Sequence, residues 1–569
     1  MFSIFIIWSY IFLISYIFGF SLVKILSITS NDEALEQLPF SLVIILGLCF
    51  VSAFAGYISL FIKIGFIANA LIFLGALLLA GVFYGELVSL FKSGFRRFCA
   101  IDKYTLALLL ISSCFILAKS AAPTSNFDTG LYHAQALRWI EEYPVIPGLG
   151  NLHSRLAINS AWYLPYALFG FSFLDLGPFH ALNGFLTLVF SLVSLQGLSN
   201  LIKKQYSCSN ILRAGMALPG ILVYKDQLSA PTPDIPAALL TCLLFIYFVQ
   251  LREQGDKVSP RILTLGIVLL AAFAVTIKLS ALPLSLVILV LLGREITRGR
   301  PSSLLPAAGG ILILVLPFFL RNFWLSGYLL YPAAGLDLFN VDWKIPVAEV
   351  QDVKRAILEF GRDPKYLAPP GAAGTSWGWL PFWLPQVITE YRGKLRLIWL
   401  ASLILLLDWL VRMIRMRTCK IDLRELGKYQ VLYLTAAVGL IFWFFTAPDP
   451  RFVLGLLMVI AVIIPLPFLK AYDYQVGPPV PWCLGLLLLY FLVAFGVQDL
   501  PATAARLWRP APYPQGVLVR EEIQGHEVYF PSDRRGLCWY GPLPCAYHPA
   551  KFVFRGQEIA AGFKPGTPP

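Results

Sequence analysis

The sequence predicts an all-α membrane protein that crosses the bilayer about fourteen times. Of its 569 residues, 58% are hydrophobic and only 14% are charged, which is too little polar surface to cover a water-soluble globule. The apolar residues fall in repeated runs of about 15 to 25, close to the length that spans a bilayer. Short clusters of Lys and Arg separate the runs and orient the helices by the positive-inside rule.

The expected spans are assigned in chain order from these apolar runs. They cover residues 1–23, 40–62, 66–91, 104–118, 180–200, 210–224, 235–250, 261–277, 280–293, 302–320, 393–411, 429–446, 451–469 and 480–498. Several runs are short for a membrane about 30 Å thick, and short helices are tolerated where they line an enclosed cavity. The first run has no basic segment before it and no cleavage site, so we expect it to be retained.

Three regions follow from this assignment. Residues 1–103 form N-terminal transmembrane helices, residues 104–499 form a transmembrane core, and residues 500–569 form an extracytoplasmic cap. With the basic clusters in the cytoplasm, the long loops 119–179 and 321–394 and the tail all face outside. The same clusters account for the net charge of +13, so no nucleic-acid partner is expected.

The cap differs in composition from the helical part. Short β-like runs, GVLV and HEVYF, are punctuated by Pro and Gly and predict strands. Cys538 and Cys545 lie in the segment CWYGPLPC, which faces an oxidising compartment; they fit either a disulfide or two free thiols in a packed turn. The nine Cys show no CxxC spacing and give no metal signature.

The loop 119–179 concentrates the polar chemistry, in DTGLYHAQALRWIEEYPVIPGLGNLHSRLAINS at 128–160. A helix from Thr129 to Tyr143, stepping about 100° per residue, would carry one polar stripe. That stripe holds Asp128, Tyr132, Gln135, Trp139 and Glu142. His133 falls on the opposite side among apolar residues, so we expect a packed, supporting histidine there.

Asp128 is the candidate catalytic residue. At the start of the expected helix it suits an N-cap, and a carboxylate there can also be a general base that takes the proton from an acceptor hydroxyl. Partial burial at the membrane surface is expected to raise its pKa toward a useful value. Glu141 and Glu142 read as acids on the helix surface, and Glu142 is preferred for substrate binding because it shares the stripe.

These features resemble the GT-C superfamily of multi-pass glycosyltransferases across most of the chain. The similarity lies in the large first extracytoplasmic loop with an acidic residue near its start, the later short loop with a Pro-Asp pair, here Pro233-Asp234, and a basic or polar loop after a mid-chain helix. The first loop also looks like that of a group of uncharacterised bacterial membrane proteins with the pattern DxGLYHxQxxRWxEEYP. The superfamily resemblance implies inverting transfer of a sugar from a polyprenyl-phosphate donor to an acceptor outside the bacterial inner membrane.

This sequence differs from the superfamily pattern at one point. Many members carry an acidic pair in the first loop, whereas Asp128 is followed by Thr129 and Gly130. A hard divalent cation wants several oxygen ligands close together. We therefore expect no bound metal, although one is compatible with the superfamily, and no other cofactor is implied.

Basic residues are then expected to balance the phosphate of the donor. The candidates for the lipid phosphate are Lys278, Arg321 and Arg451; snorkelling explains the first two equally well, and a turn pair with Asp449 explains the third. The candidates for sugar or acceptor binding are Glu142, Arg138, His153, Arg155, Asn159 and Asp234, with Tyr132 and His133 in support. Asp234 also suits a helix N-cap, because Pro236 follows closely.

Two other functions fit the same composition. An O-antigen polymerase or ligase is also a multi-helix enzyme with charged outer loops, and its glycan is linked to a diphosphate. A polysaccharide or lipid exporter is a transporter and not an enzyme; repeat symmetry is common in such folds, and none is visible here. The partners expected under the leading hypothesis are the lipid-linked sugar, membrane lipids, and a glycan, lipid or protein acceptor.

Overall fold

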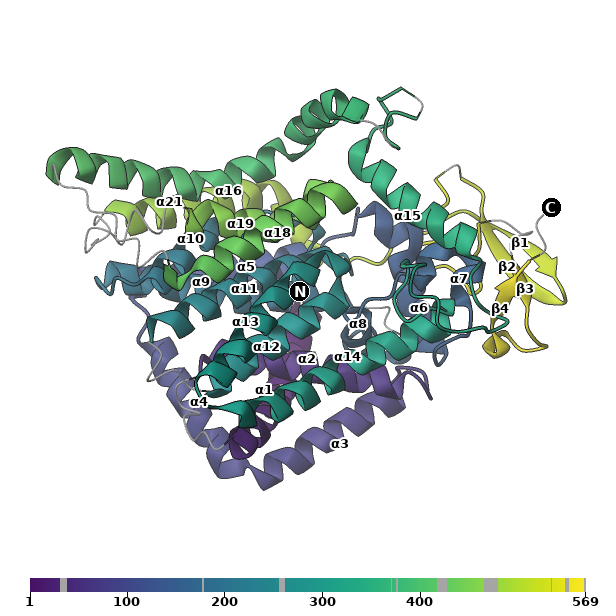
Figure 1. The fold of residues 1–569 in the computed structure, drawn as a ribbon, viewed down its shortest axis with the longest axis horizontal. Coiled ribbons are helices and arrows are strands. Elements are labelled where there is room, and N and C mark those ends of the chain that lie inside the picture. The colour runs from purple at the N-terminus through teal and green to yellow at the C-terminus, as the bar shows by residue number, and fades with distance from the viewer. Residues whose placement is uncertain are drawn as a thin grey trace.

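The computed structural model describes the chain except residues 31–37, 176–178, 255–260, 370, 375–376, 417–426, 465–478, 534, 548–551 and 567–569. The described part is mostly helical, with four short strands at one end (Figure 1). The longer helices are α1 (Phe2–Ser30), α2 (Phe40–Ile58), α3 (Phe66–Val82), α4 (Tyr84–Cys99), α5 (Lys103–Ser120), α9 (Leu182–Ile202), α10 (Cys208–Leu222), α11 (Asp234–Glu253), α12 (Arg261–Ile277), α13 (Ser285–Thr297), α14 (Leu304–Ser326), α15 (Val347–Arg362), α16 (Leu380–Met416), α18 (Gln430–Thr446), α19 (Leu454–Ile463) and α21 (Pro479–Ala504). The short helices that matter for the site are η2 (Thr129–His133), α6 (Ala134–Glu142), α7 (Leu149–Leu152), α8 (Tyr163–Phe169), η6 (Leu279–Leu284) and η9 (Pro450–Phe452).

Eight helical segments of the described residues are long and apolar enough to cross a membrane, or nine if the bent pair α3 and α4 counts as one. They are α1, α2, α5, α9, α11, α13 with η6, α14, and α21. Helices also form at the other expected spans, but α12, α18 and α19 have only 10 to 17 residues. The expected membrane-type helical fold is confirmed at this level, and the count of fourteen crossings stays a prediction.

The run expected as one span over 66–91 is two helices. The axes of α3 and α4 meet at 91°, because the two segments suit different surroundings. Helix α3 has no charged residue and exposes Leu78 and Val82. Helix α4 carries Glu86, Arg96 and Arg97 on an amphipathic sequence, which is typical of a helix that lies along a membrane surface.

Helix α11 is the centre of the helical body. In the apolar stretch of α11, 94% of the residues are buried, and α9, α10, α12 and α19 pack around this helix. Helix α19 crosses α11 closely because Gly455 faces the backbone of Ala238; a Cβ at Gly455 would lie 2.5 Å from the Ala238 Cα. This crossing sets η9, which precedes α19, beside the start of α11.

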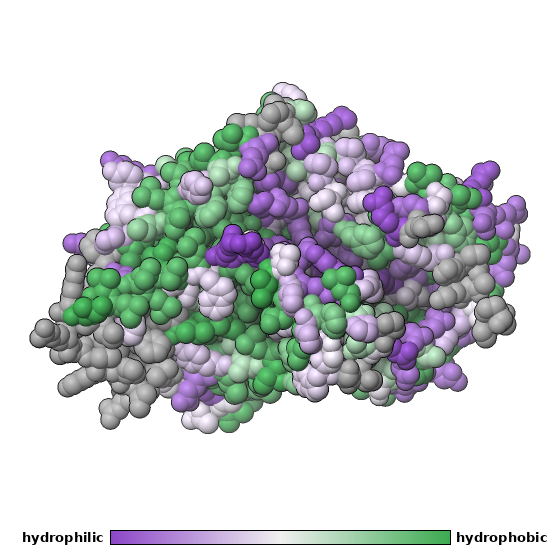
Figure 2. Space-filling view, turned by 90° about the horizontal axis from the view of Figure 1, so that it is seen from above, coloured by the Kyte–Doolittle hydropathy of each residue, from purple (hydrophilic) through white to green (hydrophobic). Residues whose placement is uncertain are grey.

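One end of the body carries the polar elements. Helices α6, α7 and α15 gather there with the strands of the cap (Figure 1). Strand β1 (Leu518–Ile523) pairs antiparallel with β2 (His526–Pro531), and β3 (Phe552–Phe554) pairs with β4 (Phe563–Pro565). The expected strand HEVYF is confirmed, whereas GVLV contributes only its last two residues to β1. Viewed from above, apolar side chains cover much of the surface, and hydrophilic ones gather around a hollow and toward the other end (Figure 2).

Candidate functional site

Four charged side chains from distant segments meet in two ion pairs. Nη1 of Arg451, in η9, donates to Oδ2 of Asp128 at 2.8 Å. Nζ of Lys278, between α12 and η6, donates to Oδ1 of Asp234 in the first turn of α11. The ring of Phe452 joins the two pairs, because its centroid lies 3.8 Å from Nζ of Lys278 and 4.7 Å from Cζ of Arg451. We call Asp128, Asp234, Lys278 and Arg451 the charge cluster.

Neither acid of the cluster serves as a helix cap. The N–H of Thr129 donates instead to Oδ1 of Asn126 at 2.9 Å, and the Asp128 side chain accepts no capping hydrogen bond. The cap position before α11 is Pro233, and Asp234 is already helical. The N-cap interpretation of both acids is therefore wrong, and their carboxylates face cations from other segments.

The Asp128 side chain is 17% exposed. Burial alone would raise the pKa of Asp128, but the nearby positive charges, that of Arg451 above all and those of Arg155 and Lys278, outweigh it and hold that pKa below its ordinary value. The expected upward shift is therefore wrong, because the sequence does not show that Arg451 contacts this carboxyl group. Asp128 is ionised at neutral pH.

His133 lies beside the cluster and is 2% exposed. Burial lowers its pKa to about 4, so the imidazole is neutral at pH 7. Its ring contacts those of Tyr132 and Tyr163, with centroids 4.3 and 5.8 Å away. These contacts agree with a packed histidine.

Sequence reasoning missed a third acid, Asp449. Its side chain is 4% exposed and lies 3.2 Å from Nε of Arg451, and it accepts hydrogen bonds from the Arg451 N–H at 2.9 Å and from the Tyr391 hydroxyl at 2.5 Å. The motif APDPRF suggested only a local turn pair. Asp449 does form that pair, and it also fixes the guanidinium that reaches Asp128.

Three residues of the cluster, Asp234, Lys278 and Arg451, line a pocket between α11, η6, α18 and α19. Asp128 is outside its lining and reaches it through Arg451. The rest of its wall is mainly apolar: Ala237, Ala238, Ala281, Pro283, Leu284, Gly439, Trp443, Phe452, Val453, Gly455 and Leu456. About 540 Å³ is free of atoms, including the part open to solvent. We call this the cluster pocket; it can hold an anion that carries an apolar chain.

The model of the family described as Domain of unknown function (DUF8201) matches residues 1–458. The chain belongs to the DUF8201 family. The match includes all four residues of the charge cluster and ends before the cap strands. Among curated proteins, none matches the chain.

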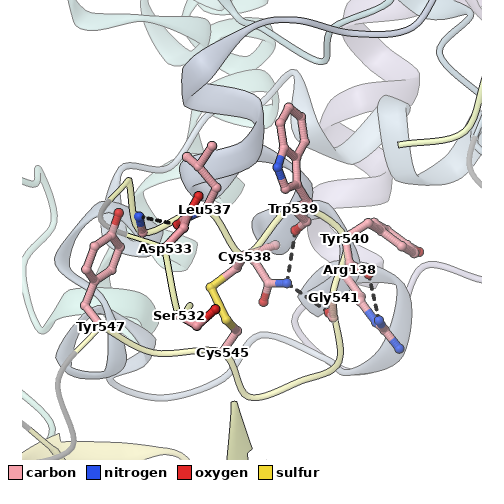
Figure 3. The surroundings of a disulfide bond; sticks show 12 residues. Arg138, Ser532, Asp533, Leu537, Cys538, Trp539, Tyr540, Gly541, Cys545 and Tyr547 are labelled. Carbon is pink, nitrogen blue, oxygen red and sulfur yellow. Dashed lines mark hydrogen bonds between the residues drawn. A yellow bond between two sulfur atoms is a disulfide. The ribbon is translucent and has the colours of Figure 1, made fainter. Parts of the chain in front are cut away.

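The predicted binding residue Arg138 and the stripe residue Gln135 of this DUF8201 member contact the cap. Nε of Arg138 donates to Oε1 of Glu142 at 2.5 Å, and its Nη1 donates to the backbone oxygen of Tyr540 at 2.8 Å. Nε2 of Gln135 donates to the backbone oxygens of Trp539 and Gly541 at 3.1 and 2.9 Å. Arg138 thus faces the segment beside the disulfide (Figure 3). Their contacts join α6 to the cap.

Of the two acids expected on the helix surface, Glu142 lies there and Glu141 does not. Glu141 is buried and accepts a hydrogen bond from the Tyr540 hydroxyl, whereas Glu142 is exposed. Burial raises the pKa of Glu141 to about 8. The uniform 100° step fails because the helix opens with the π-helical turn η2, whose wider i to i+5 hydrogen bonds shift the phase.

Three further predicted residues lie around these contacts. Nδ1 of His153 accepts a hydrogen bond from the Arg155 N–H at 3.1 Å, and its ring lies 4.7 Å from that of Tyr547 in the cap. The guanidinium of Arg155 lies 6.0 Å from the Tyr132 ring. Nδ2 of Asn159 donates to the Phe318 backbone oxygen at 3.2 Å.

Arg321 lines a different pocket from Lys278 and Arg451, so the structure separates a group that the sequence put together. Nowhere in the described part of the chain do three or more His, Cys, Asp or Glu side chains gather as metal ligands would. Metal independence stays a prediction.

Proposed function

We propose that the protein is an inverting glycosyltransferase that uses a polyprenyl-phosphate sugar. The cluster pocket carries this proposal, because it joins two cations and their acids to an apolar wall. A polyprenyl-phosphate sugar has the matching order of parts, with an apolar chain, an anionic phosphate and a polar sugar. Lys278 and Arg451 are suited to the phosphate, and the apolar wall is suited to the first isoprene units.

The proposed reaction assigns a role to each charge. The ionised Asp128 takes the proton from an acceptor hydroxyl as that oxygen attacks C1 of the sugar. The bond between C1 and the phosphate oxygen breaks, and its electrons stay with polyprenyl phosphate, whose added charge is balanced by Lys278 and Arg451. Attack from the face opposite the leaving group inverts C1.

The GT-C-like fold and an extracytoplasmic site belong to the same proposal. After α5, the chain passes through successive pairs of helices, α9 with α10, α11 with α12, α13 with α14, and α16 with α18. After each pair, the chain returns to a segment that belongs to the charge cluster or lies near it. If the short helices also cross the membrane, the chain crosses fourteen times, and all of these segments lie outside the bacterial inner membrane.

The test compares envelope glycans and lipid-linked sugars of cells that lack the gene with cells complemented by the wild type or by Asp128→Asn. The wild type should restore one glycan modification, and the variant should restore at most about 1% of it, since loss of a general base reduces rates by roughly 10²-fold or more. Asp226→Asn is the matched control, because Asp226 is an exposed acid paired with Lys119 and Lys225. Glycans unchanged by loss of the gene, or full activity of Asp128→Asn, would refute the proposal.

A further inference from the structure

A second pocket lies under the first loop, away from the residues proposed to bind the donor. It is bounded by α6, the segment that follows it, α8 and the end of α14, and about 390 Å³ is free of atoms, including the part open to solvent. Its wall is largely apolar, with Ile140, Val145, Leu149 and Leu325 among the lining residues. Among the lining residues that the structure describes, Arg321 is the only cation. We call it the Arg321 pocket.

Arg321 is buried there without a charged partner. The residue is 4% exposed, and its Nη1 donates to Oγ of Ser59 at 2.7 Å. Within the described part of the chain no acidic side chain pairs with it, and its Nε has no hydrogen-bond partner. A buried cation with neither a counter-charge nor a full set of acceptors is unfavourable, so this arrangement calls for an anion.

Trp139 adds an independent observation from another element. It lines the same pocket, is 2% exposed, and its indole Nε1 has no hydrogen-bond partner. Buried indole N–H groups usually have an acceptor. Two unsatisfied buried donors, from α6 and α14, thus belong to one pocket with an apolar wall.

We propose that the Arg321 pocket binds the anionic head of an amphiphile, a phosphate ester or a carboxylate attached to an apolar chain. The guanidinium supplies the charge and paired donors that suit such oxygens, the Trp139 N–H supplies a further donor, and the apolar wall takes the chain. The site is separate from the charge cluster, and the proposal does not depend on the glycosyltransferase function.

The experiment measures thermal unfolding and binding of the full chain in an uncharged detergent. The probes are decyl phosphate, decanoate, inorganic phosphate and decyltrimethylammonium. Decyl phosphate or decanoate should raise the unfolding temperature. Arg321→Gln should reduce this rise by the same amount in the wild type and in Lys278→Gln, because the Arg321 pocket and the cluster pocket bind independently. Arg321→Lys should reduce it less. Trp139→Phe keeps an aromatic ring, though a smaller one, and removes the N–H, and it should weaken binding several-fold.

Asp226→Asn changes an exposed acid outside both pockets; it is the control and should keep the full response to decyl phosphate. A response that Arg321→Gln leaves unchanged, or a loss on Arg321→Gln that disappears in the Lys278→Gln background, would overturn the proposal. Equal binding of inorganic phosphate would overturn the amphiphile assignment, and an equal response to decyltrimethylammonium would overturn anion recognition. If Arg321→Gln does not fold, Trp139→Phe decides: unchanged affinity for both anionic amphiphiles would contradict the site.

Discussion

Neighbouring charges decide the opposite behaviour of two buried carboxyl groups in the first loop. Asp128 contacts Arg451, and its pKa lies below its ordinary value although burial acts to raise it. Glu141 accepts a hydrogen bond from Tyr540, but burial dominates and raises its pKa to about 8. At neutral pH the first group is a carboxylate suited to take a proton, and the second is mostly protonated.

Glu141 should make the stability of the cap depend on pH. Between its ordinary pKa of 4.5 and its folded pKa of about 8, the folded state binds more protons than the unfolded state. Stability therefore falls as pH rises through this window, by on the order of a few kcal/mol. Hydrogen exchange of residues 537–541 at pH 5.5 and 8.5 measures this, and Glu141→Gln should flatten the dependence.

Glu142→Gln is the matched control for that prediction, since Glu142 is adjacent and exposed. It should keep the wild-type dependence. A pH profile that persists in Glu141→Gln would show that another group controls the docking of the cap.

The cap acts on the site through one disulfide-bonded turn. Cys538 and Cys545 form the disulfide that the sequence left open. Next to it, the Trp539 N–H donates to the Gly130 backbone oxygen at 2.8 Å, and a Cβ at Gly130 would lie 2.8 Å from the Trp539 ring. The turn therefore packs directly on η2, the helix that begins at the residue after Asp128.

Removal of this disulfide should loosen the cap and disturb η2. Closing a loop of this length contributes about 2 kcal/mol in the chain-entropy account. In the double variant Cys538→Ser with Cys545→Ser, proteolysis within the cap should be faster, and the proposed transfer activity should fall more than protein abundance does. Cys99→Ser removes an exposed free cysteine on α4 and should change neither. Unchanged proteolysis of the double variant would contradict the prediction.

Composition predicted the helices well and their partners poorly. Each expected apolar run contains a helix, although residues 465–469 lie outside the described part, because removal from water depends on local apolar content. The bend between α3 and α4 and the π-helical turn η2 depend on surroundings that a fixed period ignores. The contact between Asp128 and Arg451 joins residues 323 positions apart, and no local sequence pattern predicts such a contact. The sequence therefore identified both residues as candidates for the site but did not predict that they form an ion pair.

At the scale of the whole molecule, contacts constrain the topology. Lys119 pairs with Asp226 at 3.3 Å, and Asp128 pairs with Arg451, so these segments share one side of any membrane that the helices cross. The chain must therefore cross the membrane an even number of times between Lys119 and Asp226, and likewise between Asp128 and Arg451. We predict that Arg96 and Arg97, the basic residues of α4, lie on the other side.

Cysteine labelling tests this arrangement in intact cells. In a background without exposed free cysteines, Asp226→Cys and Glu349→Cys should react with a membrane-impermeant maleimide, and Arg96→Cys should react only after the cells are opened. Labelling of all three positions, or of Arg96→Cys alone, in intact cells would contradict the topology.

The docking of the cap on α6 also has a consequence for the order of assembly. Gln135 and its acceptor Trp539 are 404 residues apart, so α6 leaves the ribosome long before its partner exists. The first loop cannot complete its packing until the cap has been synthesised and has reached the same side of the membrane. The wall around η2 is thus finished last, and a truncated chain that inserts normally would still lack it.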